Sequence, residues 1–134
     1  MVHSADQAKA ALTAALDSDI DVVLVSPPFG AQSLGIAYFQ AMLTLARQSV
    51  PDAKATAMLD CGDAPGLALA ALFAGVEMVR LSADQDMLER LDQIARSLPG
   101  KIVDQRPHNI LDLAGHANPL MAARHWLNQT GSQE

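Results

Sequence analysis

The sequence predicts an α/β fold with a single open, mainly parallel four-stranded sheet flanked by helices. This is a doubly wound arrangement of the flavodoxin or Rossmann type, with an extra helix at each end. Three observations predict it. The chain has 134 residues, which suits a single domain over 1–134. Half of its residues are hydrophobic, enough to form a core. Short apolar runs alternate with helical patterns, and alternating β and α units favour a parallel sheet.

The first elements follow from local patterns. Ser4 begins a capping-box spacing, and apolar residues then recur at helical spacing, which predicts a helix over 4–17. The apolar run in 21–26 predicts a strand buried on both faces, and two prolines end it. Ser33 is expected to cap a helix over 33–48 that is apolar on nearly every side.

The later elements continue the alternation, with caps expected at Asp63, Ser82 and Asn118. Residues 107–117 are expected to be irregular, and the tail 129–134 to be frayed. The expected strands cover 55–59, 76–82 and 101–106, and the expected helices cover 64–74, Ser82 to Leu98 and 119–128.

The predicted order of the strands is 2-1-3-4. The first strand is the most apolar and so is expected at the centre, whereas the weak second and fourth strands suit the edges. A half-barrel that dimerises into a larger barrel is the alternative arrangement.

Composition and charge exclude several function classes. Aromatic residues make up only 4% of the chain and the net charge is −6, so binding to nucleic acid or to an anionic membrane is not expected. The single cysteine, Cys61, excludes a disulfide framework and fits a reducing compartment. No secretory signal and no apolar run of membrane-spanning length is found, so a soluble cytoplasmic protein is expected.

Candidate site residues are sought where the strands end, because open parallel sheets bind ligands beyond the carboxyl ends of their strands. Four loops meet this condition, and they cover residues 26–33, 60–65, 82–86 and 104–118. The candidate ligand-binding residues in them are Ser26, Gly30, Ser33, Cys61, Gly62, Ser82, Asp104 and Arg106.

The segment Asp60-Cys-Gly-Asp63 carries the candidate chemistry. Its two carboxylates can bind a divalent cation or act as a general base, with His108 as a partner. The structural alternative is that Asp63 caps a helix and Asp60 bonds loop amides. Acidic neighbours disfavour a reactive Cys61. No metal site is predicted, and the cofactor is unknown.

Two charged residues, Glu77 and Arg80, lie within the third predicted strand. Burial of a charge is costly, so either this strand is partly exposed or the two residues form ion pairs. Exposure is the simpler interpretation and is the one predicted.

The apolar helices 34–46 and 64–74 predict contacts between subunits, because a helix that is hydrophobic all round must be covered on all sides. The sequence therefore favours a homo-oligomeric α/β module that binds a small ligand or a protein partner. The alternative is a lyase- or isomerase-type enzyme acting on a small oxo-acid or a phosphorylated metabolite.

Overall fold

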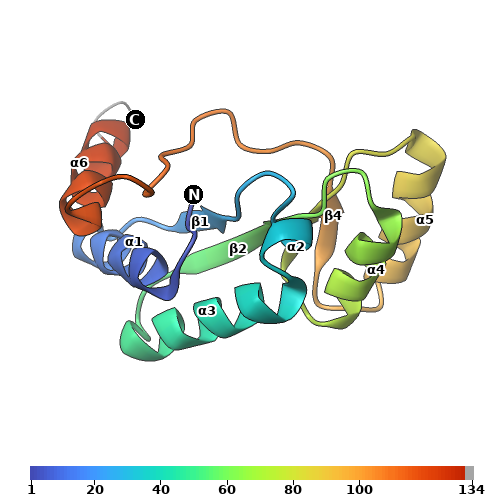
Figure 1. Cartoon of the computed structure of the whole chain (residues 1–134), viewed down its shortest axis with the longest axis horizontal. Helices are drawn as coiled ribbons and strands as arrows, with labels where there is room; N and C mark the ends of the chain where they lie inside the picture. Colours follow the sequence, from blue (N-terminus) through green and yellow to red (C-terminus); the bar gives the residue numbers. More distant parts are fainter. Residues whose placement is uncertain (132–134) are drawn as a thin grey trace.

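A computed structural model describes residues 1–131 and contains, within them, one all-parallel sheet of four strands and six helices (Figure 1). This confirms the predicted α/β class, with a single parallel four-stranded sheet flanked by helices. The strands are β1 (Val22–Val25), β2 (Ala55–Asp60), β3 (Met78–Arg80) and β4 (Lys101–Val103). The helices are α1 (Ala5–Ser18), α2 (Gly30–Ser33), α3 (Ile36–Ser49), α4 (Pro65–Phe73), α5 (Gln85–Ala95) and α6 (Pro119–Gly131).

The order of the strands differs from the prediction. The sheet has the sequential order β1-β2-β3-β4, so β1 is an edge strand and β2 is an interior strand. The apolar character of β1 has another cause: Leu24 and Val25 are buried although their strand lies at the edge. The N–H of Val2 donates to the carbonyl of Val25 (2.9 Å), and α1 packs beside the strand. The sequential order is the one that a half-barrel requires, and its completion by a second copy stays a prediction.

Three of the expected helix caps, at Ser33, Asp63 and Ser82, are wrong. Ser33 does not cap a long helix, because the chain forms the short α2 and then restarts at Gly35, whose φ of 88° favours glycine. The Ser33 hydroxyl donates instead to the carbonyl of Phe29 (3.3 Å). α4 begins after Ala64 without a side-chain cap, which leaves Asp63 exposed.

The caps of the other helices follow side-chain chemistry. Ser4 accepts the N–H of Gln7 at the start of α1 (3.2 Å), and Asn118 accepts that of Met121 in α6 (3.1 Å), as predicted. At α5 the cap is Asp84 rather than Ser82, because the Asp84 carboxylate accepts the N–H of Met87 (2.8 Å). In the predicted frayed tail, residues 129–131 continue α6, and residues 132–134 lie outside the described residues.

The two faces of the sheet are covered unequally. Leu59 and Val79 pair in register and are fully buried in a core with Phe39 of α3. On the opposite face Val23 is 45% exposed, and Thr56 and Met78 are only partly buried. α3 lies along the buried face. α1 packs against α3 and α6, α1 and α6 lie on the β1 side of the sheet, and residues 104–118 return from β4 to α6 (Figure 1).

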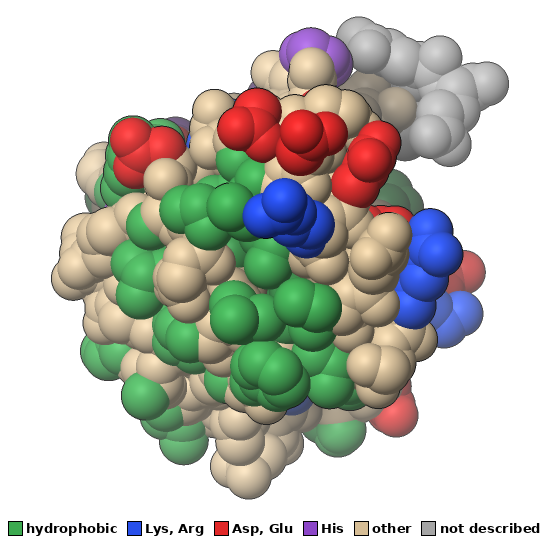
Figure 2. Space-filling view, turned by 90° about the vertical axis from the view of Figure 1, so that its right-hand side faces the viewer, with side chains coloured by type: hydrophobic (Ala, Val, Ile, Leu, Met, Phe, Trp, Pro, Cys, Tyr) green, Lys and Arg blue, Asp and Glu red, His purple; other side chains and the backbone are tan. Residues whose placement is uncertain are grey.

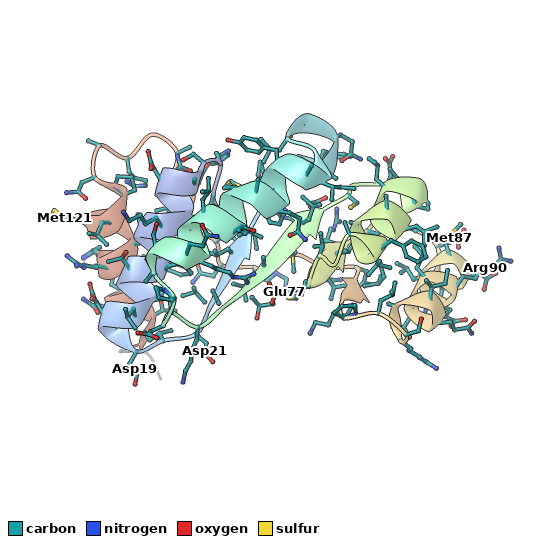
Figure 3. All side chains as sticks on the ribbon, turned by 90° about the horizontal axis from the view of Figure 1, so that it is seen from below. Asp19, Asp21, Glu77, Met87, Arg90 and Met121 are labelled. Carbon is teal, nitrogen blue, oxygen red and sulfur yellow. The ribbon has the colours of Figure 1, made fainter. Side chains whose placement is uncertain are left out.

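The view from below shows the same arrangement. α3 crosses the molecule beneath the strands, with α1 and α6 at one end and α4 and α5 at the other (Figure 3). None of the described helices combines the length and the apolar character that a membrane span requires.

Candidate functional site

A charged cluster is centred on Asp60, the last residue of β2. Its side chain is fully buried, and both carboxylate oxygens accept hydrogen bonds. Oδ1 accepts the N–H of Gly62 (2.7 Å) and faces Nη1 of Arg80 (3.5 Å), while Oδ2 accepts Nη1 of Arg106 (2.8 Å). A buried carboxylate needs such partners, because its desolvation is otherwise very costly.

Ser26 joins this cluster to the end of β1. Its hydroxyl oxygen accepts the N–H of Asp60 (2.9 Å) and donates to the carbonyl of Pro27 (3.0 Å). Its carbonyl accepts Nη2 of Arg106 (2.8 Å). The cluster therefore fastens residues 104–118 to the carboxyl ends of two strands, and sequence reasoning located Ser26, Asp60 and Arg106 correctly at this edge.

Arg80 is both partly exposed and paired, so the two interpretations of the charges in this strand hold together. Besides Asp60, its Nε donates to the carbonyl of Asp104 (3.2 Å). Glu77 forms an ion pair with Arg47 of α3. Each charge in or beside β3 thus has a partner of opposite sign, which lowers the cost of its partial burial.

The remaining predicted site residues are not drawn into the cluster by their side chains. Asp63, Ser82 and His108 are exposed, and no hydrogen bond of their side chains occurs among the described residues. Ser33 and Asp104 are also exposed. No group of three or more potential metal-ligating side chains is found in residues 1–131. Catalytic roles for Asp60, Asp63 and His108 stay predictions.

Two of the predicted residues shape the backbone next to the cluster. Gly62 has a φ of 60°, and a Cβ there would lie 2.2 Å from the ring of Phe29. At Gly30 a Cβ would lie 2.4 Å from Oγ of Ser26. Both positions therefore require glycine for close packing. Cys61, directly before Gly62, is buried. Burial, and to a lesser degree the charge of Asp60, raises the pKa of its thiol to about 12.

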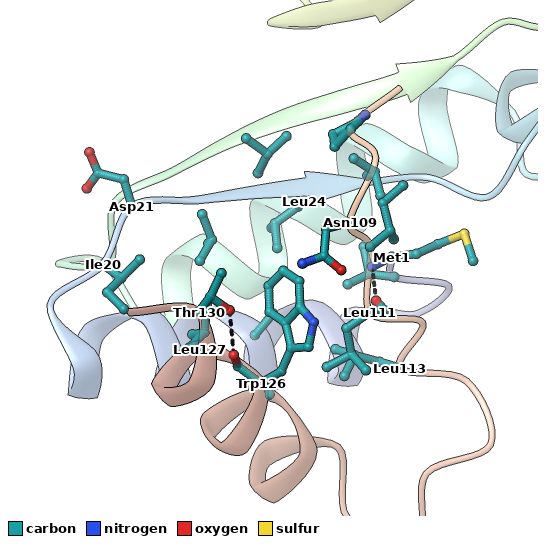
Figure 4. Close-up of a pocket in the computed structure, with 18 of the residues that line it drawn as sticks. Met1, Ile20, Asp21, Leu24, Asn109, Leu111, Leu113, Trp126, Leu127 and Thr130 are labelled. Carbon is teal, nitrogen blue, oxygen red and sulfur yellow. Dashed lines mark hydrogen bonds between the residues drawn. The ribbon is translucent and has the colours of Figure 1, made fainter. Parts of the chain in front are cut away.

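A second feature, a mainly apolar cavity, lies beside β1 (Figure 4). Its volume of about 580 Å³ falls within the range of small-molecule sites. Its walls come from the β1 edge, from α1 and α6, and from the segment that returns from β4. Trp126 and Asn109 lie near its centre in Figure 4. The lining includes Met1, Val2, Ala11, Ile20, Asp21, residues 22–25, Asn109, Ile110, Leu111, Leu113, Ala123, Trp126, Leu127 and Thr130.

The sequence analysis did not predict this cavity, because it assigned the apolar helices to contacts between subunits and sought ligand sites only beyond the carboxyl ends of the strands. A signal was present in the last helix. Ala123, Trp126, Leu127 and Thr130 recur at positions i, i+3, i+4 and i+7 and form one face of α6, and all four line the cavity. The contribution of β1 was hidden, because that strand was expected at the centre of the sheet.

The outer edge of β1 brings free backbone groups to the cavity wall. The N–H groups of Val22 and Ser26 donate toward β2 and its preceding loop, so the alternate residues Val23 and Val25 direct theirs away from the sheet. Val25 gives its carbonyl to Val2. No partner is found among the described residues for the N–H and carbonyl of Val23 or for the N–H of Val25.

The N-terminal residue connects the charged cluster with the cavity. Its amino group donates to the carbonyl of Leu111 (2.5 Å), and its sulfur lies 3.7 Å from Nη2 of Arg106. The carbonyl of Met1 accepts the N–H of Leu113 (3.1 Å). Burial lowers the pKa of the amino group from 8.0 to about 6; Asp112 raises it and Arg106 lowers it by smaller amounts.

This lowered pKa predicts a pH dependence of stability. Between pH 6 and pH 8 the unfolded chain binds more protons at its amino group than the folded chain, so stability falls as pH decreases through this window. Because the group is partly exposed, the expected loss is only about 1 kcal/mol. Urea unfolding at both pH values measures it. Acetylation of the α-amino group should remove this difference in stability. An acetylated chain whose stability depends equally on pH would contradict the assignment to the amino group.

Comparison of the chain with protein-family models, with curated proteins and with solved structures gives no match.

Proposed function

We propose that this chain is a small ligand-binding module whose ligand occupies the apolar cavity beside β1. The observation that supports this proposal is the cavity itself. Its volume is about 580 Å³, and it is lined chiefly by aliphatic side chains and the only tryptophan of the chain. Sites for small molecules combine such apolar walls with a few placed polar groups. Here the polar groups are the free backbone groups of β1 and the side chain of Asn109, with Asp21 at the start of the strand.

The charged cluster supports this function as an anchor. Arg106 binds Asp60 and Ser26, and its neighbour Pro107 begins the stretch that forms one wall of the cavity. The lyase- or isomerase-type alternative needs Asp60 and a histidine free to reach one reacting atom. Asp60 is already engaged by two arginines and His108 is exposed, so the geometry favours binding over this alternative.

Trp126 provides an intrinsic reporter of occupancy. The neutral fluorophore N-phenyl-1-naphthylamine is expected to bind with enhanced emission and to quench Trp126 by energy transfer, with saturation. In the variant Asn109→Phe the new ring takes up part of the cavity, and binding should weaken about tenfold, a loss of about 1.4 kcal/mol.

The matched control is Asn128→Phe, which adds the same ring at an exposed position of α6 outside the cavity lining. It should bind the fluorophore like the parent chain. Equal weakening in both variants, or the absence of saturable quenching in the parent chain, would overturn the proposed function.

The proposed module is homo-oligomeric, with subunits joined through the helices around 34–46 and 64–74. Two large exposed side chains support this: Phe73 at the end of α4 is 67% exposed, and Leu45 of α3 is 58% exposed. Hydrophobic side chains also cover much of the face that carries α4 and α5, below a row of acidic side chains (Figure 2). Large exposed apolar areas usually mark interaction surfaces.

Light scattering at micromolar concentration tests this self-association. The parent chain should be oligomeric, and Phe73→Asp should shift it toward the monomer, because a charge at the interface opposes burial. Met121→Asp is the control: Met121 is 64% exposed on α6, away from these helices (Figure 3). A monomeric parent chain would refute the homo-oligomer.

A further inference from the structure

We propose that the cavity ligand is a short extended peptide with free termini, which joins the outer edge of β1 as an added parallel strand. This inference rests on the proposed ligand-binding function and names the class of ligand. Its basis is the unusual combination of an apolar cavity with an unpaired strand edge in its wall.

The free backbone groups of β1 match one tripeptide. In a parallel pair, the N–H of Val23 donates to the carbonyl of the peptide residue just before the one opposite Val23. The carbonyl of Val23 accepts the N–H of the peptide residue just after it. The N–H of Val25 then engages the carbonyl of that same following residue. The first and third residues of a tripeptide therefore satisfy all three free groups, and the backbone of its second residue faces away from β1.

The edge already accepts a peptide backbone at its other end. The N–H of Val2 donates to the carbonyl of Val25 (2.9 Å), and Met1 in turn exchanges hydrogen bonds with Leu111 and Leu113. An added peptide beside Val23 would continue this pairing along the strand. Addition of a strand to a sheet edge is a general mode of peptide recognition, in which backbone bonds give affinity and pockets for alternate side chains give specificity.

The two ends of the cavity differ in their polar groups, an acceptor carboxylate at one end and an amino-group donor at the other, and this difference sets the direction of the peptide. The carboxylate of Asp21 lies just before β1 and has no partner among the described residues. Met1 lies toward the other end of the strand (Figure 4), where its amino group donates to the carbonyl of Leu111. A peptide ammonium at Asp21 and a carboxylate toward Met1 place the peptide parallel to β1.

An extended tripeptide spans at most about 10 Å and therefore fits between the two ends. Asp21 and Val25 are separated by four strand steps, which span about 13 Å. The walls suit apolar side chains: Trp126 and Leu127 lie on the α6 side, and Ile110 and Leu111 on the returning segment. A tripeptide of valine, leucine and valine has the required length and apolar character.

The test uses this tripeptide with the full chain. Trp126 emission measures affinity, and amide hydrogen exchange measures backbone pairing. Binding should slow exchange at Val23 and Val25. N-methylation of the third residue removes the donor to the Val23 carbonyl, and should weaken binding about fivefold or more. N-methylation of the second residue is the matched control and should have little effect, because that N–H faces away from β1.

Changes to the peptide termini and to Asp21 provide a second experiment. Acetylation of the peptide should weaken binding several-fold, and Asp21→Asn should weaken binding of the free peptide but not of the acetylated one. Asp52→Asn, another exposed aspartate near this end of the sheet, should leave both affinities unchanged. Equal affinity for free and acetylated peptides would refute a free-peptide ligand and indicate a segment within a longer chain.

The outcomes separate this inference from the proposed function. If the naphthylamine binds but the tripeptide neither binds nor protects Val23 and Val25, the peptide assignment is wrong and the ligand-binding module stands. If neither the naphthylamine nor the tripeptide binds at the cavity, both are wrong.

Discussion

Replacement of Asp60 by asparagine is expected to destabilise the protein by about 3 kcal/mol or more. The substitution keeps the shape of the side chain but removes the negative charge that pairs with Arg106 and Arg80. Breaking a buried ion pair by removing one partner typically costs about 3–5 kcal/mol. The lower end applies here, because the arginine side chains are 17% and 23% exposed and keep some contact with water.

Chemical unfolding of Asp60→Asn measures this loss. The matched control is Asp63→Asn, three residues away, where the carboxylate is exposed and has no partner among the described residues. It should change stability by less than about 0.5 kcal/mol, as is usual for a surface substitution. A loss of stability in Asp60→Asn no larger than in Asp63→Asn would show that the cluster does not anchor the returning segment.

Replacement of Phe39 by alanine is the second large effect, with an expected loss of about 3–5 kcal/mol. Phe39 is the largest fully buried side chain of the described residues, and it lies in the core between α3 and the sheet. Its removal leaves a cavity that the surrounding side chains fill only in part.

Tyr38→Ala is the matched control in the same helix, because the neighbouring ring is largely exposed. Alanine also has the higher helix propensity, so this variant should lose less than about 1 kcal/mol. Thermal or urea unfolding of the two variants should differ several-fold in the free-energy loss. Similar losses would contradict the packing of α3 with Phe39 toward the core.

The sequence predicted most elements of the fold but not the arrangement of its strands. Hydrophobic periodicity and alternating βα units locate the helices and strands, because they record which local segments can bury a face. The order of the strands depends on contacts between distant segments. The high apolar content of β1 therefore suggested a central position for this strand. In the structure, Leu24 and Val25 are buried by the N-terminal residues and by α1 instead.

The helix starts show how local competition limits prediction. Ser82 and Asp84 are both good caps, and only the backbone geometry decides that Asp84 accepts the N–H of Met87. Asp63 is favourable by type but lies one residue too early, since Ala64 precedes the first turn of α4.

The candidate site was predictable in part, for a physical reason. The rule that ligands lie beyond the carboxyl ends of parallel strands led to Asp60 and Arg106. It could not lead to the cavity, because that feature lies along the side of an edge strand and is closed by residues from both ends of the sequence, including Met1 and Trp126. Only the folded chain brings those segments together.

The most direct test of the central claim, that the cavity beside β1 is a ligand site, is an NMR titration with N-phenyl-1-naphthylamine. The amide signals of Val23 and Val25 and the indole signal of Trp126 should shift together and reach saturation at one equivalent of bound probe per chain. The amide of Ile102, on the opposite edge strand β4, should not move. Shifts confined to α4 or β4, or no saturable shift at the three cavity signals, would contradict the claim.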